Sequence, residues 1–227
     1  MSPSSWIVCQ LGAREHYAIP SALYSRGLLQ SLYTDAWLAP GKSLSGFAGL
    51  LFPRLKERYE NELDGAHVVD FTSSLIAFEL REKLAGRDGW ERILARNAWF
   101  QDRALASLRQ ALAAFPKDQK PVVFCYSYAA RRILEYAKSQ GCKTILGQID
   151  PGPVEEDMVT SAVAQHPELM PQFQRVPSRY WDDWREECRL ADSIVVNSAW
   201  SKRALVQAGI SADKLAVVPL MYDAPLS

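Results

Sequence analysis

The sequence predicts an α/β domain built on a doubly wound, mostly parallel sheet with helices on both faces. Short apolar runs of strand length alternate with helical patterns along the chain, strictly so from residue 121 onward. This alternation is typical of a parallel sheet whose crossover connections are helices. A chain of 227 residues can bury a full core. It contains no internal repeat, low-complexity tract or linker, so we expect a single domain over residues 1–227.

The first forty residues read as one strand–helix–strand unit. The run 6–11 is apolar and is followed by Gly12, as expected of a buried parallel strand. A helix that begins near Pro20, which suits a first turn, carries Leu29. Residues 32–37 are then expected to form the second strand.

The middle of the chain is less regular over residues 40–63. A strand is expected over 66–71, followed by a long helical region that is split near residues 86–89 and whose apolar spacing continues to Leu112.

From Pro121 the alternation predicts four more strands, at 122–126, 144–149, 193–196 and 215–218. Helices are expected over 129–139, from Ser178, and over 199–208, while the proline-punctuated stretch before Ser178 is assigned no helix. Ligands of such sheets bind at the carboxyl ends of the strands. This rule selects five loops: Gly12 to Tyr17, Thr72 to Ser74, Ser127 to Ala129, Asp150 to Pro153 and Asn197 to Lys202.

Charge and composition exclude several classes of protein. The 26 basic residues balance the 26 acidic ones, so the chain lacks the charge expected of a nucleic-acid-binding protein, and we expect no nucleic-acid partner. The amino terminus lacks the basic region of a signal peptide. The four cysteines form no CxxC pair. A reducing, cytoplasmic location without disulfides is therefore expected.

One stretch could contact a membrane. Phe47 to Phe52 is apolar and Arg54, Lys56 and Arg58 follow it, so residues 47–58 could dock peripherally on an anionic surface. The apolar part is too short to span a bilayer. The alternative is a flap that covers the core, which the interruption by glycine and proline favours.

The last fifty residues carry a family resemblance. They run as follows: Ala191-Asp192, an apolar strand, Asn197-Ser198, Ser201-Lys202 on a helix, Gly209, then Lys214 and a strand that ends at Pro219. This segment resembles the one that closes the N-terminal domain of family 4 glycosyltransferases.

The resemblance implies a Rossmann-like domain that forms one half of a GT-B fold. It implies transfer of a sugar, with retention, from a nucleotide-sugar donor to a small-molecule, glycan or lipid-linked acceptor that this N-terminal half binds. The basic pair and the Glu-x7-Glu segment of the family's donor-binding C-terminal domain are absent, so that domain is the expected partner and this chain alone is expected to be inactive. The family's glycine-rich first loop is reduced to Gly12.

The candidate site residues lie on four of the strand-end loops. Gly12 to Tyr17 could face an anion or contact acceptor or donor; the alternative is a solvated loop. Asp150 could accept a sugar hydroxyl, or serve only the turn. A cation in a first helical turn opposes the helix dipole, so Lys202 favours an anionic ligand or a carboxylate partner. The full set is Gly12, Arg14, Glu15, His16, Tyr17, Ser127, Tyr128, Asp150, Asn197, Ser198, Ser201 and Lys202.

Other chemistries lack their signatures. The acidic runs 155–157 and 182–183 are not Asp-x-Asp loops and no histidines cluster, so we expect no metal and no other cofactor. There is no Gly-x-Ser-x-Gly elbow and no Gly-x-Gly-x-x-Gly after the first strand. The alternative to a transferase half is a non-catalytic Rossmann-like binding or scaffolding module, or one chain of a split enzyme.

Overall fold

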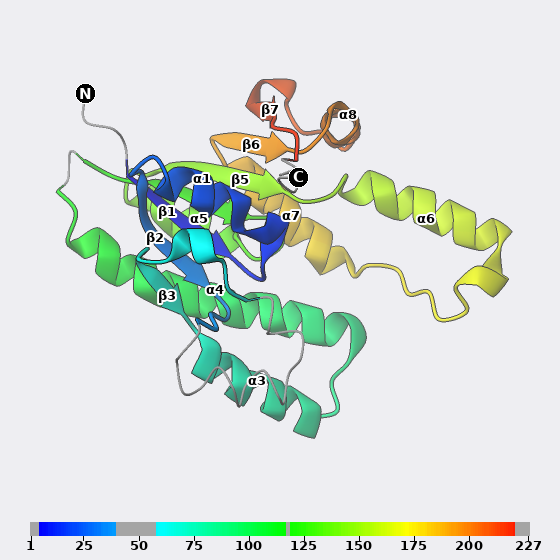
Figure 1. Cartoon of the computed structure of the whole chain (residues 1–227). Helices are drawn as coiled ribbons and strands as arrows, with labels where there is room; N and C mark the ends of the chain where they lie inside the picture. The colour runs from blue at the N-terminus through cyan, green and yellow to red at the C-terminus, as the bar shows by residue number, and fades with distance from the viewer. Residues whose placement is uncertain (1–4, 40–57, 117–118, 221–227) are drawn as a thin grey trace, which may run out of the picture.

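The seven strands of the described residues belong to one sheet. Figure 1 shows the computed structural model of the chain, which describes residues 5–39, 58–116 and 119–220. Every neighbouring pair of strands is parallel, and the order across the sheet is β3-β2-β1-β4-β5-β6-β7. The α/β class and the parallel sheet predicted from the sequence are therefore confirmed. The strands are β1 (Trp6–Gln10), β2 (Leu29–Thr34), β3 (Val68–Asp70), β4 (Val122–Tyr126), β5 (Lys143–Gln148), β6 (Ser193–Val196) and β7 (Leu215–Val217).

The strand order reverses between β1 and β4. The chain builds outward from β1 to β3 and then returns to place β4 on the other side of β1. The loops that leave β1 and β4 therefore run to opposite faces, which opens a crevice at their carboxyl ends.

Helices cover both faces of the sheet (Figure 1), although unequally. On one face α4, α5 and α7 pack side by side, while α1 and the short helical turn 61–63 lie on the other. Side chains alternate between the two faces along each strand, so each layer of helices packs on its own set of strand residues. The helices are α1 (Ala18–Tyr24), α3 (Thr72–Leu84), α4 (Gly89–Ala113), α5 (Arg131–Ser139), α6 (Pro153–Gln165), α7 (Ser178–Leu190) and α8 (Ala199–Gln207).

The larger core lies beneath α4, α5 and α7. Neighbouring positions on β1 and β4 place Cys9 and Cys125 in it, and the fully buried Trp184 of α7 reaches it from the helix layer. All four cysteines are buried free thiols. The opposite face holds a smaller core around Phe124 and Tyr126.

The second strand begins three residues earlier than the sequence predicted. The helix α1 ends at Tyr24, and Gly27 (φ 65°) turns the chain while the amide of Leu28 donates to Leu23 O at 2.9 Å. This is a glycine-terminated helix end. Leu29 therefore begins β2, and the prediction that it belongs to the helix was wrong.

A helix is present where the sequence predicted none. Pro153 lies in the first turn of α6, with Glu155 and Glu156 beside it, which are both favourable at a helix start. No residue of α6 is buried, and the helix projects away from the sheet (Figure 1). Without a buried face it has little apolar periodicity for a sequence pattern to detect.

Gly147 is expected to be essential for packing on β5. A Cβ atom there would lie 2.6 Å from Phe124 Cζ and 3.0 Å from Tyr126 Cδ1. Overpacking of this kind costs about 1–3 kcal/mol, so Gly147→Ala should lower the free energy of unfolding by that amount in urea titrations. Phe124→Leu, which removes the clashing atom, should reduce the cost of Gly147→Ala in a double-mutant cycle. Additive costs would contradict this account.

Candidate functional site

The loop that follows β1, residues 12–17, is anchored at the carboxyl edge of the sheet by the buried carboxylate of Asp35. Gly12 (φ 93°) donates its amide to Asp35 Oδ1 at 2.9 Å. Asp35 is fully buried at the end of β2 and pairs with Arg96 at 2.8 Å and with Arg58 at 3.8 Å. A Cβ atom at Gly12 would lie 3.1 Å from the Arg58 guanidinium and would strain the backbone at this positive φ, so glycine suits the position on both counts.

The same loop contains a strained backbone. Glu15, His16 and Tyr17 have φ of 49°, 49° and 61°, a region that side chains with a Cβ atom rarely enter. Such residues cost about 1–3 kcal/mol each and persist where the surrounding structure holds them. Here Glu15 accepts a hydrogen bond from the Tyr126 hydroxyl at 3.1 Å, and Tyr17 is buried against Trp37. Tyr17 thus belongs to the core, whereas Glu15 and His16 stay at the edge of the sheet.

The turn after β4 is clamped by a buried glutamate. Tyr128 has φ of 74°, and its amide donates to Glu187 Oε2 at 2.7 Å. The amides of Ala130 and Arg131 donate to the other oxygen, Oε1, at 2.8 and 3.1 Å. Glu187 comes from α7 and is 1% exposed. It therefore fixes the start of α5 and, with it, the position of Tyr128.

The pKa of Glu187 predicts a pH dependence of stability. Burial raises this pKa from 4.5 to about 7, although the three amides oppose the shift. Folding therefore favours the protonated form, so this contribution to stability is complete below about pH 4.5 and is lost as the pH rises to about 7. The change should approach 3 kcal/mol, at about 1.4 kcal/mol per pKa unit.

Glu187→Gln, which cannot titrate, is the comparison for this prediction. The difference in unfolding free energy between the parent chain and this variant should shrink or change sign as the pH rises from 4.5 to 7. A constant difference across that range would contradict a titrating Glu187.

Asp150 is the centre of a hydrogen-bond cluster at the end of β5. Its Oδ1 atom accepts hydrogen bonds from the Tyr128 hydroxyl, from Gln148 Nε2 at 3.1 Å and from the amide of Gly152 at 2.8 Å. The buried Trp184 in turn donates to Gln148 Oε1 at 2.9 Å. Burial and the Asp150 charge raise the pKa of Tyr128, so this phenol stays a donor. No donor to Oδ2 is found in the described part of the chain.

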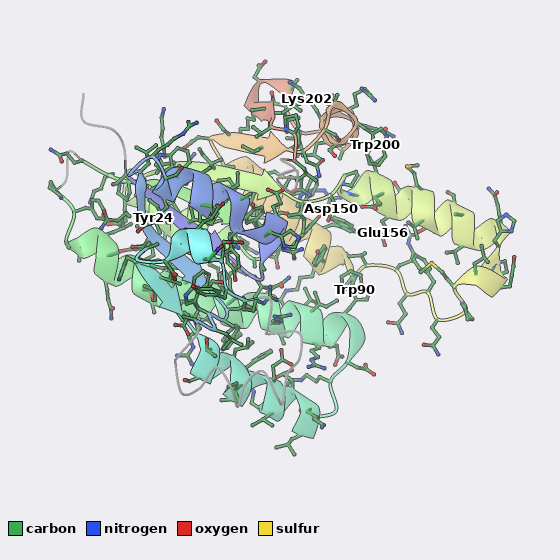
Figure 2. The ribbon with its side chains drawn as sticks, viewed as in Figure 1. Tyr24, Trp90, Asp150, Glu156, Trp200 and Lys202 are labelled. Carbon is green, nitrogen blue, oxygen red and sulfur yellow. The ribbon has the colours of Figure 1, made fainter. Side chains whose placement is uncertain are left out.

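Asp150 and Tyr128 line a small pocket of about 110 Å³, here called the strand-end pocket. Ser127 lines it, and its buried Oγ atom has no hydrogen-bond partner among the described residues. In Figure 2, Asp150 lies at the base of α6, with Glu156 further out on that helix. The predicted residues that line the pocket are Arg14, Ser127, Tyr128 and Asp150.

A second, larger cavity of about 440 Å³ lies on the α1 side of the sheet and is mostly apolar. We call it the apolar cavity. The predicted residues Glu15, His16 and Asn197 line it, together with Phe124 and Val195. The predicted loops thus serve two compartments on opposite sides of Tyr126, which lines both.

The polar side chains of the loop after β6 form hydrogen bonds within the protein. Ser198 Oγ accepts from the amide of Ser201 at 3.0 Å, and Ser201 Oγ donates to Asn197 Oδ1 at 3.0 Å. Lys202 Nζ donates to the carbonyl of Leu215 at 2.9 Å, so it ties α8 to β7 (Figure 2). The ammonium group therefore contacts a backbone carbonyl, where the sequence suggested a carboxylate or an anionic ligand.

Most of the stretch considered for membrane contact, residues 47–57, lies outside the described residues. Arg58 is described, and its side chain is only 18% exposed because it turns inward to Asp35. No helix within the described ranges is long and apolar enough to cross a membrane. The same ranges hold no group of three or more metal-ligating side chains.

Sequence reasoning missed several residues of the site. Gln148, Glu187, Asn97, Tyr180 and Asp35 all contribute, but they lie on strands or on helices that are remote in sequence. Only Glu187 carried a signal, because a carboxylate three places after a buried Trp on a helix lies on the same, inward-facing side.

No protein-family model matches the sequence, and no curated protein matches it. Several solved structures do resemble the fold. UGT2 from Phytolacca americana aligns with a TM-score of 0.54 at 12% identity, over 98% of this chain and 53% of its own. Arabidopsis thaliana UGT89C1, complexed with UDP-L-rhamnose, aligns with a TM-score of 0.53 at 12% identity, over 98% and 50%.

A UDP-glucosyltransferase from Polygonum tinctorium that glucosylates indoxyl, solved with 3,4-dichloroaniline, aligns with a TM-score of 0.50 at 14% identity, over 98% and 53%. At these identities the likeness concerns the fold, which is that of a GT-B glycosyltransferase. The chain spans about half the length of these proteins. It therefore has the Rossmann-like architecture of one half of a GT-B fold.

Proposed function

We propose that this chain is the acceptor-binding half of a glycosyltransferase that moves a sugar from a nucleotide-sugar donor to an acceptor. A second GT-B domain would bind most of the donor, and the reacting groups would meet at the carboxyl edge of the sheet. The fold and the half-length alignments support the transferase, and the hydrogen bonding at the strand ends supports the acceptor role.

The main support for the acceptor role is that a backbone amide at each of five strand ends already donates a hydrogen bond to a side chain of the protein. Phosphate-binding sheets leave the amides at these helix starts free for the anion. Here side chains of the protein accept hydrogen bonds from them at five strand ends. The pairs are Gly12 with Asp35, Thr72 with Asp70, Tyr128 with Glu187, Gly152 with Asp150, and Ser201 with Ser198.

Four of these five acceptors are carboxyl groups, each of which holds an amide that a phosphate would need. The same groups suit an acceptor that carries hydroxyls. Asp150 Oδ2 can accept a hydrogen bond from an acceptor hydroxyl. Binding of this kind orients the hydroxyl toward the donor, which is a major source of rate enhancement.

The stereochemistry follows from the resemblance to family 4 glycosyltransferases, which implies retention. Proton NMR of the first product formed by a two-domain protein would give its anomeric configuration. Inversion would contradict the family assignment while leaving glycosyl transfer intact.

The function is tested by assaying this chain with and without a donor-binding domain. We expect UDP- and GDP-sugars to bind the 227-residue chain only weakly in calorimetry, and turnover to require the longer protein. Micromolar affinity of the chain for a nucleotide sugar would contradict the acceptor assignment. Absence of glycosyl transfer by the longer protein with any donor would favour a binding or scaffolding module.

A further inference from the structure

A polar groove adjoins the strand-end pocket. It has a volume of about 750 Å³ and lies between α4, α5 and α7. Asn97, Tyr128 and Tyr180 line both the groove and the pocket, so the two spaces meet at these side chains. A ligand that occupied both spaces would pass these three side chains.

The two volumes indicate the size of that ligand. Small-molecule sites usually measure about 300–1,000 Å³. The strand-end pocket, at about 110 Å³, is too small to hold a whole ligand of this kind, whereas the groove falls within the range. The pocket can hold the reacting end of a molecule whose larger part lies in the groove.

The charges of the groove are compensated within the protein. Arg131 and Arg179 face Asp183, Arg132 pairs with Asp102, and Arg87 pairs with Glu82. Compensated cations offer little attraction to an anionic ligand. They still supply N–H donors, and carboxylate and amide groups beside them supply acceptors. This mixture suits a neutral ligand with many hydroxyl groups.

An aromatic wall stands where the groove meets the pocket. Tyr180 stacks on Tyr128 with 4.6 Å between ring centroids and an interplanar angle of 18°, and Trp90 packs edge-on against Tyr180 at 5.2 Å. Aromatic surfaces with polar tips bind the apolar faces of sugar rings while the tips hydrogen-bond to hydroxyls.

We propose that the acceptor is a neutral oligosaccharide of at least two sugar units. Its terminal unit presents a hydroxyl to Asp150 in the strand-end pocket, and the next units lie along Tyr180 in the groove. This inference rests on the proposed function and specifies its substrate class.

The test compares neutral sugars of different length on the 227-residue chain. Saturation-transfer NMR is measured with maltotriose, cellotriose and triacetylchitotriose, and with glucose and N-acetylglucosamine as their monosaccharides. At least one trisaccharide should bind at least tenfold more tightly than its monosaccharide and receive saturation on more than one ring.

Substitutions in the groove and in the apolar cavity show where the trisaccharide binds. Tyr180→Ala should abolish the advantage of the trisaccharide, and Glu135→Ala, an exposed change in the groove that leaves the core untouched, should reduce it. Val195→Thr in the apolar cavity should change nothing. If the trisaccharide and its monosaccharide bind equally tightly, and Asp150→Asn weakens the binding of both, this inference is overturned while the proposed acceptor site is retained. Binding lost in Val195→Thr, or no binding by any sugar, would also overturn it.

Discussion

Replacement of Glu187 by alanine is expected to lower the free energy of unfolding at pH 7 by about 2–4 kcal/mol. The change leaves the buried amides of Tyr128, Ala130 and Arg131 without an acceptor. Each unsatisfied donor costs about 1–3 kcal/mol, and the relief of a buried charge offsets part of the sum. Urea denaturation measures the loss, and thermal unfolding should show a fall of roughly 10 °C, at about 2–4 °C per kcal/mol for a chain of this size.

The neighbouring Glu186 provides the matched control. Its carboxylate pairs with Arg189 on the surface of the same helix at 2.6 Å. Pairs of this kind contribute about 0–1 kcal/mol. Glu186→Ala should therefore change stability little, and equal effects of the two substitutions would show that the amide contacts of Glu187 are not what stabilises the turn.

The Asp150→Asn substitution in the two-domain protein is expected to lower kcat/KM for the acceptor reaction about ten- to a hundred-fold. The asparagine side chain keeps one oxygen to accept the hydrogen bonds from Tyr128, Gln148 and Gly152. It replaces the other carboxylate oxygen, Oδ2, by an NH2 group, which donates. Loss of a hydrogen bond to a charged group costs about 1.5–3 kcal/mol, which corresponds to that change in rate.

Asp157→Asn is the control for this change, because Asp157 is an exposed carboxylate on α6. It should retain full activity, and both variants should unfold at nearly the temperature of the parent. Full activity of Asp150→Asn would remove Asp150 from the acceptor site. A large loss of stability in that variant would instead assign the residue to the turn alone, which is the alternative that the Asp-Pro-Gly-Pro sequence left open.

In the Asn197 to Lys202 segment, the hydrogen-bond partner of Lys202 differs from the one that the sequence suggested. A lysine in the first turn of a helix opposes the helix dipole, so an anionic partner was a reasonable expectation. The lysine side chain is long enough to cross to the neighbouring strand, where the carbonyl of Leu215 accepts its hydrogen bond. The choice between these partners depends on how α8 lies against β7, and no local pattern specifies that arrangement.

The sequence by itself determined the parallel α/β sheet, because strand-length apolar runs and helical periodicity are local properties of the chain. It also placed Arg14, Ser127, Tyr128 and Asp150 at strand ends, where the topology then brought them together. Only the tertiary structure decided the acceptors of two strand-end amides, since Asp35 and Glu187 lie 23 and 59 residues from Gly12 and Tyr128. These long-range hydrogen bonds form only after the helices pack, and they occupy amides that a phosphate-binding edge would leave free.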